Sequence, residues 1–322
     1  MAGGNSYLDN LRLGQSVVLT NLAMGYSNGD FVADKIYPVI PINAFPTVRV
    51  PEMNRAHLKV IEDLRTLYGD VARRKSEDLV YQDISLREHS QEEMVDIQEL
   101  MNASVIDLKK TRTYEVTESL LLNIEKSVAE EVQLNTNYTN SNTETLTGVD
   151  QWTHASSDPI EQIWDAKEVI RGLIGRFPNT MLLGATSAWS LQKNANVVTA
   201  LKGANQGGTV TLKQLADYFN LPGGIHVGTG VYDNSEAISD TYDPVDLWLD
   251  NCVLAYVTQK SADQRSMYDP SFGYTFQHSS FRPSIITYPS TDKKKTIIQG
   301  TMIWAHKMYN DACGYLIKDT NV

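Results

Sequence analysis

Residues 107–134 read DLKKTRTYEVTESLLLNIEKSVAEEVQL, a stretch without proline or glycine. Apolar residues recur within it at intervals of three and four: Leu121, Ile124, Val128 and Val132. This spacing places them on one face of a helix, and Asp107 is the expected N-cap. At about 1.5 Å per residue the helix would be roughly 40 Å long. This length suggests a spine along which other elements lie, although on the helix alone an ordinary long core helix is the favoured interpretation.

Composition indicates a folded protein without a membrane span. The chain has 322 residues, which suggests two domains or one large one. Hydrophobic residues make up 42%, enough for a sizeable core. No apolar run approaches the ~18 residues of a membrane span, and the N-terminus lacks a secretory signal pattern. The net charge of -11 predicts a poor general binder of nucleic acid, because neutralising phosphates requires clustered Lys and Arg.

The cysteines are few. Cys252 and Cys313 each lie in an apolar segment. Free buried thiols are the expected state, and the low count fits a reducing compartment. A disulfide between the two is the alternative.

Of the familiar catalytic motifs, the sequence matches only Ser-x-x-Lys, at Ser190-Leu191-Gln192-Lys193, as many chains of this length would. It contains no Gly-x-Ser-x-Gly, His-Glu-x-x-His or Cys-x-x-Cys pattern. Four carboxylates within residues 91–100 would suit a divalent metal or an acid–base pair, but the calcium-loop pattern is missing and solvent exposure is favoured. These are Glu92, Glu93, Asp96 and Glu99. The six histidines are far apart in sequence. We expect a protein that is not an enzyme, with no catalytic residue, metal or cofactor.

Residues 1–50 have the character of an arm. Pro38, Pro41, Pro46 and Pro51 punctuate their end, which forbids helix and favours extended backbone. The apolar run 39–42 cannot bury itself, so it must lie across its own chain or a neighbouring one. A strand that joins the main fold is the equally supported alternative.

Residues 51–90 are rich in charges of both signs and contain little that could form a core. We interpret them as a projecting element, with a strand over 79–86. Mixed charges suit an interface that requires correct register. Without other information, a solvated charged surface is the favoured interpretation. The candidate interface residues are Arg55, Lys59, Glu62, Asp63, Arg65, Arg73, Arg74, Lys75 and Glu77.

Short motifs after the predicted spine follow one another in a characteristic order. Asp158-Pro159 predicts a helix start, Pro178-Asn179 a turn, and residues 180–183 a buried strand. Later come a helix-then-strand pattern, an apolar core strand, a glycine-aromatic segment and an apolar end, at residues 212–228, 245–257, 270–276 and 311–317. Between apolar runs, Lys293-Lys294-Lys295 predicts a hairpin turn.

In order and spacing, these motifs, together with Trp152, Leu120-Leu121-Leu122 and Glu125, resemble the major capsid proteins of tailed phages. The resemblance runs from about residue 21 to the end. It implies an α+β protein of the Hong Kong 97-like capsid fold. The implied parts are an N-terminal arm (1–50), an extended loop hairpin (51–90), a peripheral domain with the spine helix (91–160 and 281–322) and an axial domain (161–280).

The resemblance also implies a function. Copies would assemble into hexamers and pentamers of an icosahedral phage head that encloses double-stranded DNA without sequence-specific binding. The other implied partners are a separate scaffold protein, a portal and a decoration protein, with no membrane. The protein would belong to the virion, after assembly in the bacterial host cytoplasm.

Two alternatives stay open. An encapsulin-like cellular shell would hold protein cargo in place of a genome. A hydrolase with an α+β fold would require a deep pocket with convergent polar groups. Some capsid proteins of this kind cross-link a loop lysine to a neighbour's asparagine. Neither Lys59 nor Lys75 aligns with such a position, so we expect no cross-link.

Overall fold

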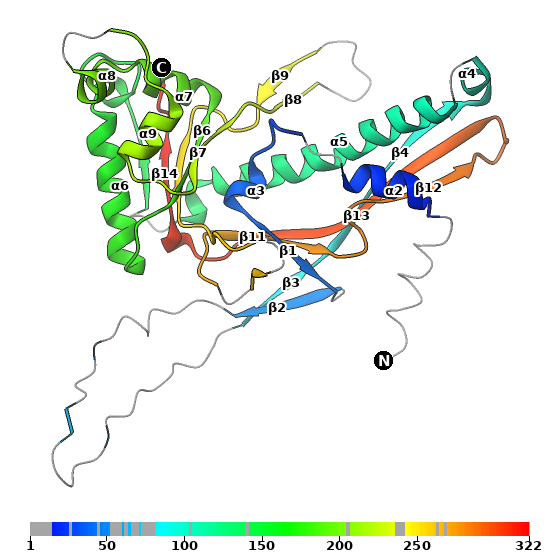
Figure 1. The fold of residues 1–322 in the computed structure, drawn as a ribbon, viewed down its shortest axis with the longest axis horizontal. Coiled ribbons are helices and arrows are strands. Elements are labelled where there is room, and N and C mark those ends of the chain that lie inside the picture. Colours follow the sequence, from blue (N-terminus) through cyan, green and yellow to red (C-terminus); the bar gives the residue numbers. More distant parts are fainter. Residues whose placement is uncertain are drawn as a thin grey trace.

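A computed structural model describes residues 15–25, 28–43, 46–51, 60, 64–65, 71, 81–102, 105–138, 142–203, 207–235, 242–261, 264–266 and 269–321. These residues form two five-stranded sheets and two two-stranded sheets. The long helix α5 (Val105–Val132) reaches from the helices gathered at one end of the molecule towards the opposite tip (Figure 1). The molecule is therefore elongated along its spine.

Helix α5 confirms the predicted spine, with shifted ends. Its 28 residues span about 42 Å. Val128 and Val132 are buried as predicted, whereas Leu121 and Ile124 are only half-buried. The predicted N-cap was wrong, because the helix begins at Val105 and Asp107 lies in its first turn.

The first large sheet is built around the long strand β13. Strand β4 pairs with residues 295–304 along one edge of β13. On the other edge, β12 pairs with residues 296–301 and β11 with residues 304–308. The strands are β1 (Val39–Ile42), β4 (Arg87–Asp96), β11 (Gly273–His278), β12 (Ser284–Pro289) and β13 (Lys295–Met308).

Helix α5 packs on this sheet at very close range. A Cβ added to Gly300 of β13 would lie 2.6 Å from Val116 Cγ1 and 3.1 Å from Leu120 Cδ1 of the helix. Met302 and Trp304 of the same strand join Val116 and Leu120 in a buried cluster. The missing side chain at position 300 is thus what allows the helix to approach the strand.

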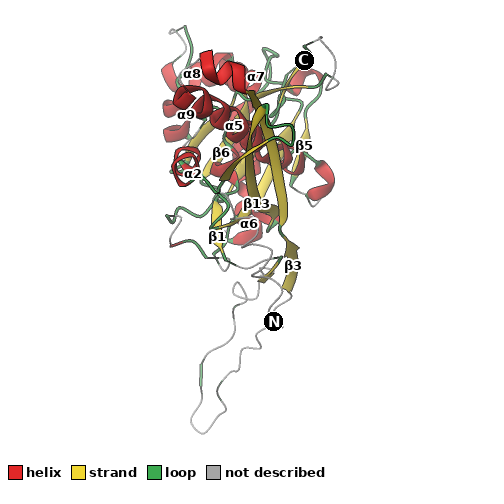
Figure 2. Cartoon of the chain, turned by 90° about the vertical axis from the view of Figure 1, so that its right-hand side faces the viewer, coloured by secondary structure: helices red, strands yellow, loops and turns green. Residues whose placement is uncertain are grey.

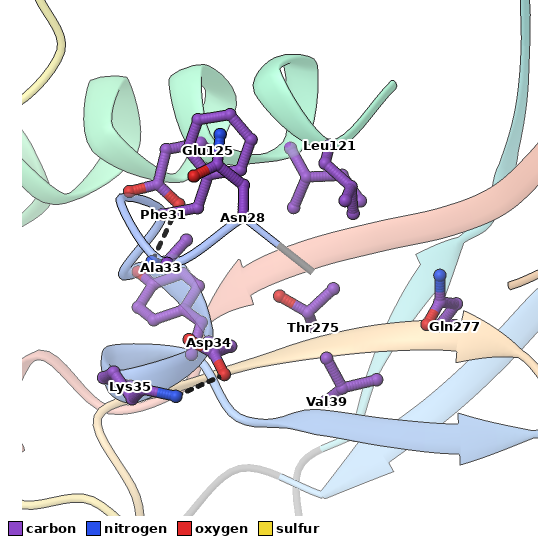
Figure 3. A pocket seen from close by; sticks show the side chains of 13 residues that line it. Asn28, Phe31, Ala33, Asp34, Lys35, Val39, Leu121, Glu125, Thr275 and Gln277 are labelled. Carbon is purple, nitrogen blue, oxygen red and sulfur yellow. Dashed lines mark hydrogen bonds and ion pairs between the residues drawn. The ribbon is translucent and has the colours of Figure 1, made fainter. Parts of the chain in front are cut away.

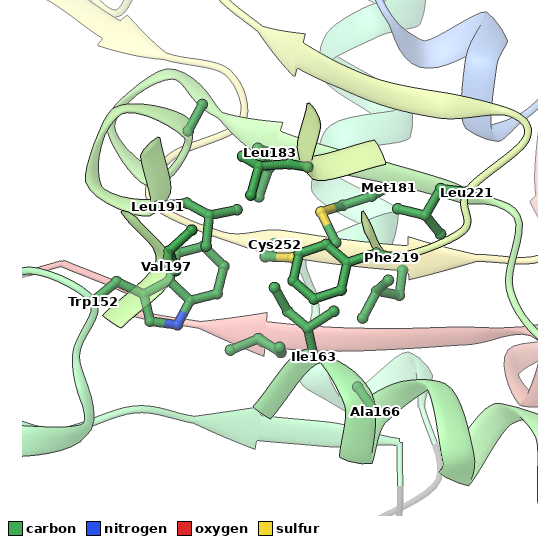
Figure 4. Packing of buried hydrophobic residues seen from close by; sticks show 14 of the residues in the cluster. Trp152, Ile163, Ala166, Met181, Leu183, Leu191, Val197, Phe219, Leu221 and Cys252 are labelled. Carbon is green, nitrogen blue, oxygen red and sulfur yellow. The ribbon is translucent and has the colours of Figure 1, made fainter. Parts of the chain in front are cut away.

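The second large sheet carries the main helical core. Its order is β5 (Thr143–Thr145), β14 (Gly314–Lys318), β10 (Cys252–Ala255), β6 (Thr180–Gly184) and β7 (Gly224–Gly228). The associated helices are α6 (Pro159–Ile174), α7 (Ala185–Lys193), α8 (Ala195–Lys202) and α9 (Leu212–Tyr218). Ile163, Met181, Phe219 and Cys252 meet in the core between them (Figure 4).

Several local predictions in this region are confirmed. Asp158 caps α6, because its carboxylate accepts from the backbone N–H groups of Ile160 and Glu161 at 3.2 Å each. Strand β6 and helix α9 followed by β7 lie where the sequence predicts them. The lysine-rich turn joins β12 to β13, and Lys293 adopts a positive φ of 58°.

The N-terminal segment joins the body of its own chain. Helix α2 (Val17–Met24) packs on β12 and α5. The short helix α3 (Ala33–Ile36) contacts α5, β6 and β11, and β1 pairs in parallel with β11. Of the two predicted placements for residues 39–42, the structure selects the strand within the main fold.

The core strand predicted over residues 245–257 is present but shorter, because only β10 (Cys252–Ala255) is a fully buried strand within this range. The structure divides it into β9 (Pro244–Asp246), which pairs with β8 (Val231–Asp233), and β10. Between them Leu249 has a φ of 45°. The chain turns here because the Trp248 ring packs directly against Gly228, where an added Cβ would lie 2.1 Å from the ring.

Strands from different expected domains pair within the same sheet. Strand β4 runs unbroken across residues 90 and 91. Strand β11, expected in the axial part, pairs in the first sheet, and β14, expected in the peripheral part, pairs in the second. Pairing depends on which strand edges meet in space, and sequence order does not reveal that.

Figure 2 shows β1 and β3 towards one end of the molecule and α7, α8 and α9 towards the other.

Both cysteines are free and buried, so the disulfide alternative is wrong. Burial raises the pKa of the Cys252 thiol. Among the described helices, none is long and apolar enough to cross a membrane.

Candidate subunit interface

Most of the predicted interface residues lie outside the described residues. These are Arg55, Lys59, Glu62, Asp63, Arg73, Arg74, Lys75 and Glu77. Arg65 is described, and its side chain is exposed. What the structure shows clearly is the base from which this charged segment leaves the body and to which it returns.

The base is an antiparallel pair of strands, β2 (Thr47–Pro51) and β3 (Tyr81–Ser85). Val48, Val50 and Ile84 point inward and join a buried cluster with residues of the first sheet. The Tyr309 hydroxyl, near the end of β13, donates to the carbonyl of Pro51. The two limbs are therefore anchored to the body where they meet it.

The other face of this pair carries exposed charge. Arg49 Nε lies 3.1 Å from Asp83 Oδ1, and its guanidinium carbon lies 5.7 Å from the centre of the Tyr81 ring. Both charged side chains are more than half exposed. An exposed ion pair of this kind contributes at most about 1 kcal/mol to the monomer, so these groups are available to an outside partner.

A buried carboxylate on the spine holds the N-terminal segment in place. Glu125 accepts from the backbone N–H groups of Val32 at 2.9 Å and Ala33 at 2.8 Å, and from Trp248 Nε1 at 2.6 Å. We call this arrangement the Glu125 latch. It joins α5, the first turn of α3 and the β9–β10 connection. Sequence reasoning missed it, and the signal was a single carboxylate within the apolar part of the helix.

The latch borders a cavity of about 350 Å³ between α3, α5 and β11 (Figure 3). Burial raises the pKa of Glu125, although its three hydrogen bonds oppose the rise. Leu121, Val39 and Thr275 also line the cavity. The single buried carboxylate here is occupied in binding donors of its own chain, which is a structural role.

The predicted carboxylate cluster is partly neutralised by an arginine. Arg112 of α5 lies 3.3 Å from Glu93, 3.5 Å from Glu99 and 2.8 Å from Glu115. We call this group the Arg112 cluster; it joins β4, α4 (Ile97–Asn102) and α5. Across the described part of the chain, no group of three or more His, Cys, Asp or Glu residues is arranged to hold a metal ion.

Two histidines distant in sequence meet beneath the spine. The His89 ring stacks on Trp304 with centroids 4.4 Å apart, and Trp304 stacks on His306 at 5.5 Å. Burial lowers the pKa of both histidines. His306 Nε2 lies 3.9 Å from Glu131 of α5. The pairing of β4 with β13 creates this stack, so no sequence spacing could reveal it.

Comparisons with known proteins match this architecture to phage capsids. The chain is 32% identical over 306 residues to the major capsid protein of Burkholderia phage BcepMu, covering 94% of this chain and 96% of that protein. A phage-related protein from Bordetella bronchiseptica superposes with a TM-score of 0.75 at 22% identity, covering 96% of this chain and 98% of that one. The mature capsid of bacteriophage PhiM1 gives a TM-score of 0.54 at 12% identity, covering 92% and 89%. No family model matches the chain.

The long spine helix, the two sheets and these superpositions define a Hong Kong 97-like capsid fold. On the identity to the Burkholderia phage protein over nearly its whole length, the chain belongs to the major capsid proteins of tailed phages. These are structural proteins, so the hydrolase alternative loses its support. The relative from a phage also favours a phage head over a cellular shell.

Proposed function

We propose that this chain assembles into hexamers and pentamers of an icosahedral phage head that encloses double-stranded DNA. The observation that carries the proposal is the relation to a phage major capsid protein over 94% of the chain. The net charge of -11 suits a wall that does not grip the packaged DNA. Assembly would take place in the bacterial host cytoplasm, with a scaffold protein, a portal and a decoration protein as partners.

We further propose that the segment leaving the body at β2 and returning at β3 is the extended loop, and that it contacts a neighbouring copy. Arg65 and its eight charged companions would supply register-setting contacts there. The exposed Arg49 and Asp83 at the base of this segment support this role. The N-terminal arm, peripheral domain and axial domain are proposed with the boundaries given above, although β4 crosses residues 90 and 91 and both large sheets combine strands from different parts.

Electron microscopy of the chain expressed alone and with its candidate scaffold tests the proposal. Closed shells, or rings of five and six, are the expected result. A monodisperse monomer under all conditions would overturn it. Particles that contain nucleic acid would support the phage head, whereas a bound protein cargo would favour the cellular shell.

A boiled denaturing gel of such particles tests for covalent links. We expect the intact monomer, because neither Lys59 nor Lys75 aligns with a cross-linking position. A ladder of higher masses would contradict this expectation.

A further inference from the structure

Two buried polar side chains on β11 face the cavity beside the Glu125 latch. Thr275 is 3% exposed and Gln277 is 8% exposed, and both line the cavity. They are two positions apart on one strand, so they project from the same face of the sheet. Figure 3 shows both side chains rising from β11 towards α5.

These two side chains lack partners. Among the residues that the structure describes, no hydrogen bond reaches the side chain of Thr275 or Gln277. Burying a polar group without a hydrogen-bond partner is costly. A bound group that supplies the missing donors and acceptors is therefore favoured here.

The other walls of the cavity are largely apolar. Leu121 and Ile124 belong to the hydrophobic stripe of the spine, but they are only half-buried where they line this space. Phe31 and Val39, from the N-terminal segment, are half-buried at the cavity as well. The volume of about 350 Å³ lies within the range of about 300–1,000 Å³ typical of small-molecule sites. Such sites combine apolar walls with a few convergent polar groups.

The charged groups that line the cavity are satisfied within the chain. Glu125 accepts three hydrogen bonds, and Asp34 lies 2.8 Å from Lys35 at the exposed edge. An anionic ligand would meet the buried Glu125 carboxylate. An ammonium ligand would lose its water without gaining a carboxylate that needs a partner. The cavity therefore favours a neutral ligand.

We propose that this cavity is a binding site for a small neutral molecule with an apolar body and a carboxamide group. The Gln277 amide both donates and accepts, and the Thr275 hydroxyl does either, so a ligand amide matches both side chains. The apolar body lies between Leu121 and Val39. At about 30 Å³ for each water-sized group, the space takes roughly ten heavy atoms.

A ligand at this site touches three parts of the fold: the N-terminal segment, the spine α5 and strand β11. It binds only when these parts are packed together, so it stabilises their packing by mass action. The site makes the attachment of the N-terminal segment to the spine responsive to a small molecule. This role goes beyond the proposed assembly and does not depend on it.

Titration of the unassembled full-length chain with phenylacetamide, a neutral amide of this size, tests the site. We expect a dissociation constant on the order of 1 mM. Methyl NMR should show the largest shifts at Leu121 and Ile124, with Leu134, beyond the end of the same helix, unmoved. No binding, or shifts confined to other residues, would overturn the inference.

Two charged probes of similar shape test the preference for a neutral ligand. Phenylacetate carries a negative charge and phenethylamine a positive one. Each should bind at least about tenfold more weakly than phenylacetamide. Equal or tighter binding of either would overturn the assignment of ligand class.

A substitution at Gln277 tests the hydrogen bonds. Q277L should weaken phenylacetamide binding about tenfold, the loss expected for one hydrogen bond to the ligand. The matched control is Q299L, because Gln299 is a half-buried glutamine of β13 in the same sheet but lies outside the cavity. Equal affinities of Q277L and Q299L would contradict the proposal. Circular dichroism checks the fold, and T275V, which keeps the side-chain shape, gives the same comparison if Q277L does not fold.

The same titration on assembled particles distinguishes two sources of the amide. Binding that persists supports a small-molecule site. Binding that disappears on assembly would overturn it, because a side chain of a neighbouring copy would then fill the cavity. Neither result bears on whether the chain assembles, so the proposed function is tested separately.

Discussion

Glu125 and Arg112 lie on the same spine helix and hold their charges in different surroundings. Glu125 is buried and binds three uncharged donors from two other segments. Arg112 is partly exposed and faces three carboxylates. Water screens the charges of the Arg112 cluster. If the Glu125 carboxylate were removed, by contrast, the buried donors of the latch would have no replacement acceptor. The difference shows that burial decides how much a polar contact stabilises the fold.

Replacing Glu125, the carboxylate of the latch, should give the largest loss of stability. Replacing Glu125 by Ala leaves the Val32 and Ala33 N–H groups and Trp248 Nε1 without their acceptor, and should lower the free energy of unfolding by about 3 kcal/mol. Urea unfolding of the unassembled chain measures this. The matched control is Glu118, which also lies on α5 but is exposed and accepts a hydrogen bond from Asn28. E118A should lower the free energy of unfolding by less than about 0.5 kcal/mol. Equal losses would contradict the argument from burial.

A substitution at Gly300 tests how α5 packs on β13 between Arg112 and Glu125. An added methyl group would meet Val116 and Leu120, so Gly300→Ala should cost about 1–3 kcal/mol through overpacking. Gly172 in α6 has open space around its Cβ position. There Gly172→Ala should stabilise by about 0.5–1 kcal/mol. Thermal unfolding of both variants measures these changes in stability. If G300A leaves the stability unchanged, α5 and β13 can move apart without an energetic cost, and the packing argument is wrong.

The histidine stack extends the comparison to pH. Burial lowers the pKa of His89 in the folded chain, so the neutral ring is favoured there. The stability that comes from burying neutral His89 is fully present above the ordinary histidine pKa of about 6.5, and it is lost as the pH falls below this value. Urea unfolding at a series of pH values should show a shallower acid loss for His89→Gln than for the wild type. The exposed His154→Gln serves as control, and parallel curves for all three proteins would rule out the His89 contribution.

The Arg112 cluster should give the smallest effect. Arg112→Gln removes three exposed or partly exposed ion pairs and should cost below about 1 kcal/mol. The cost should shrink further in high salt, because mobile ions screen these charges. Unfolding measured at low and high salt tests both statements. A large loss of stability that does not depend on salt would show that the Arg112 contacts stabilise the fold as strongly as those of Glu125, which contradicts the argument from burial.

Local sequence patterns predicted the elements well. The spacing of Val128 and Val132 predicted the spine, and Asp158-Pro159 predicted the start of α6. The predicted core strand was too long, because no local pattern shows that Trp248 leaves the strand direction to contact Gly228 and Glu125.

What the sequence alone determined is the set of elements and the family resemblance, because helix periodicity, caps and turns act over a few residues. The tertiary structure decided which sheet β11 and β14 join and which donors reach Glu125. The latch spans 93 residues to Val32 and 123 residues to Trp248. Contacts over such separations depend on how whole elements pack, which no local pattern records.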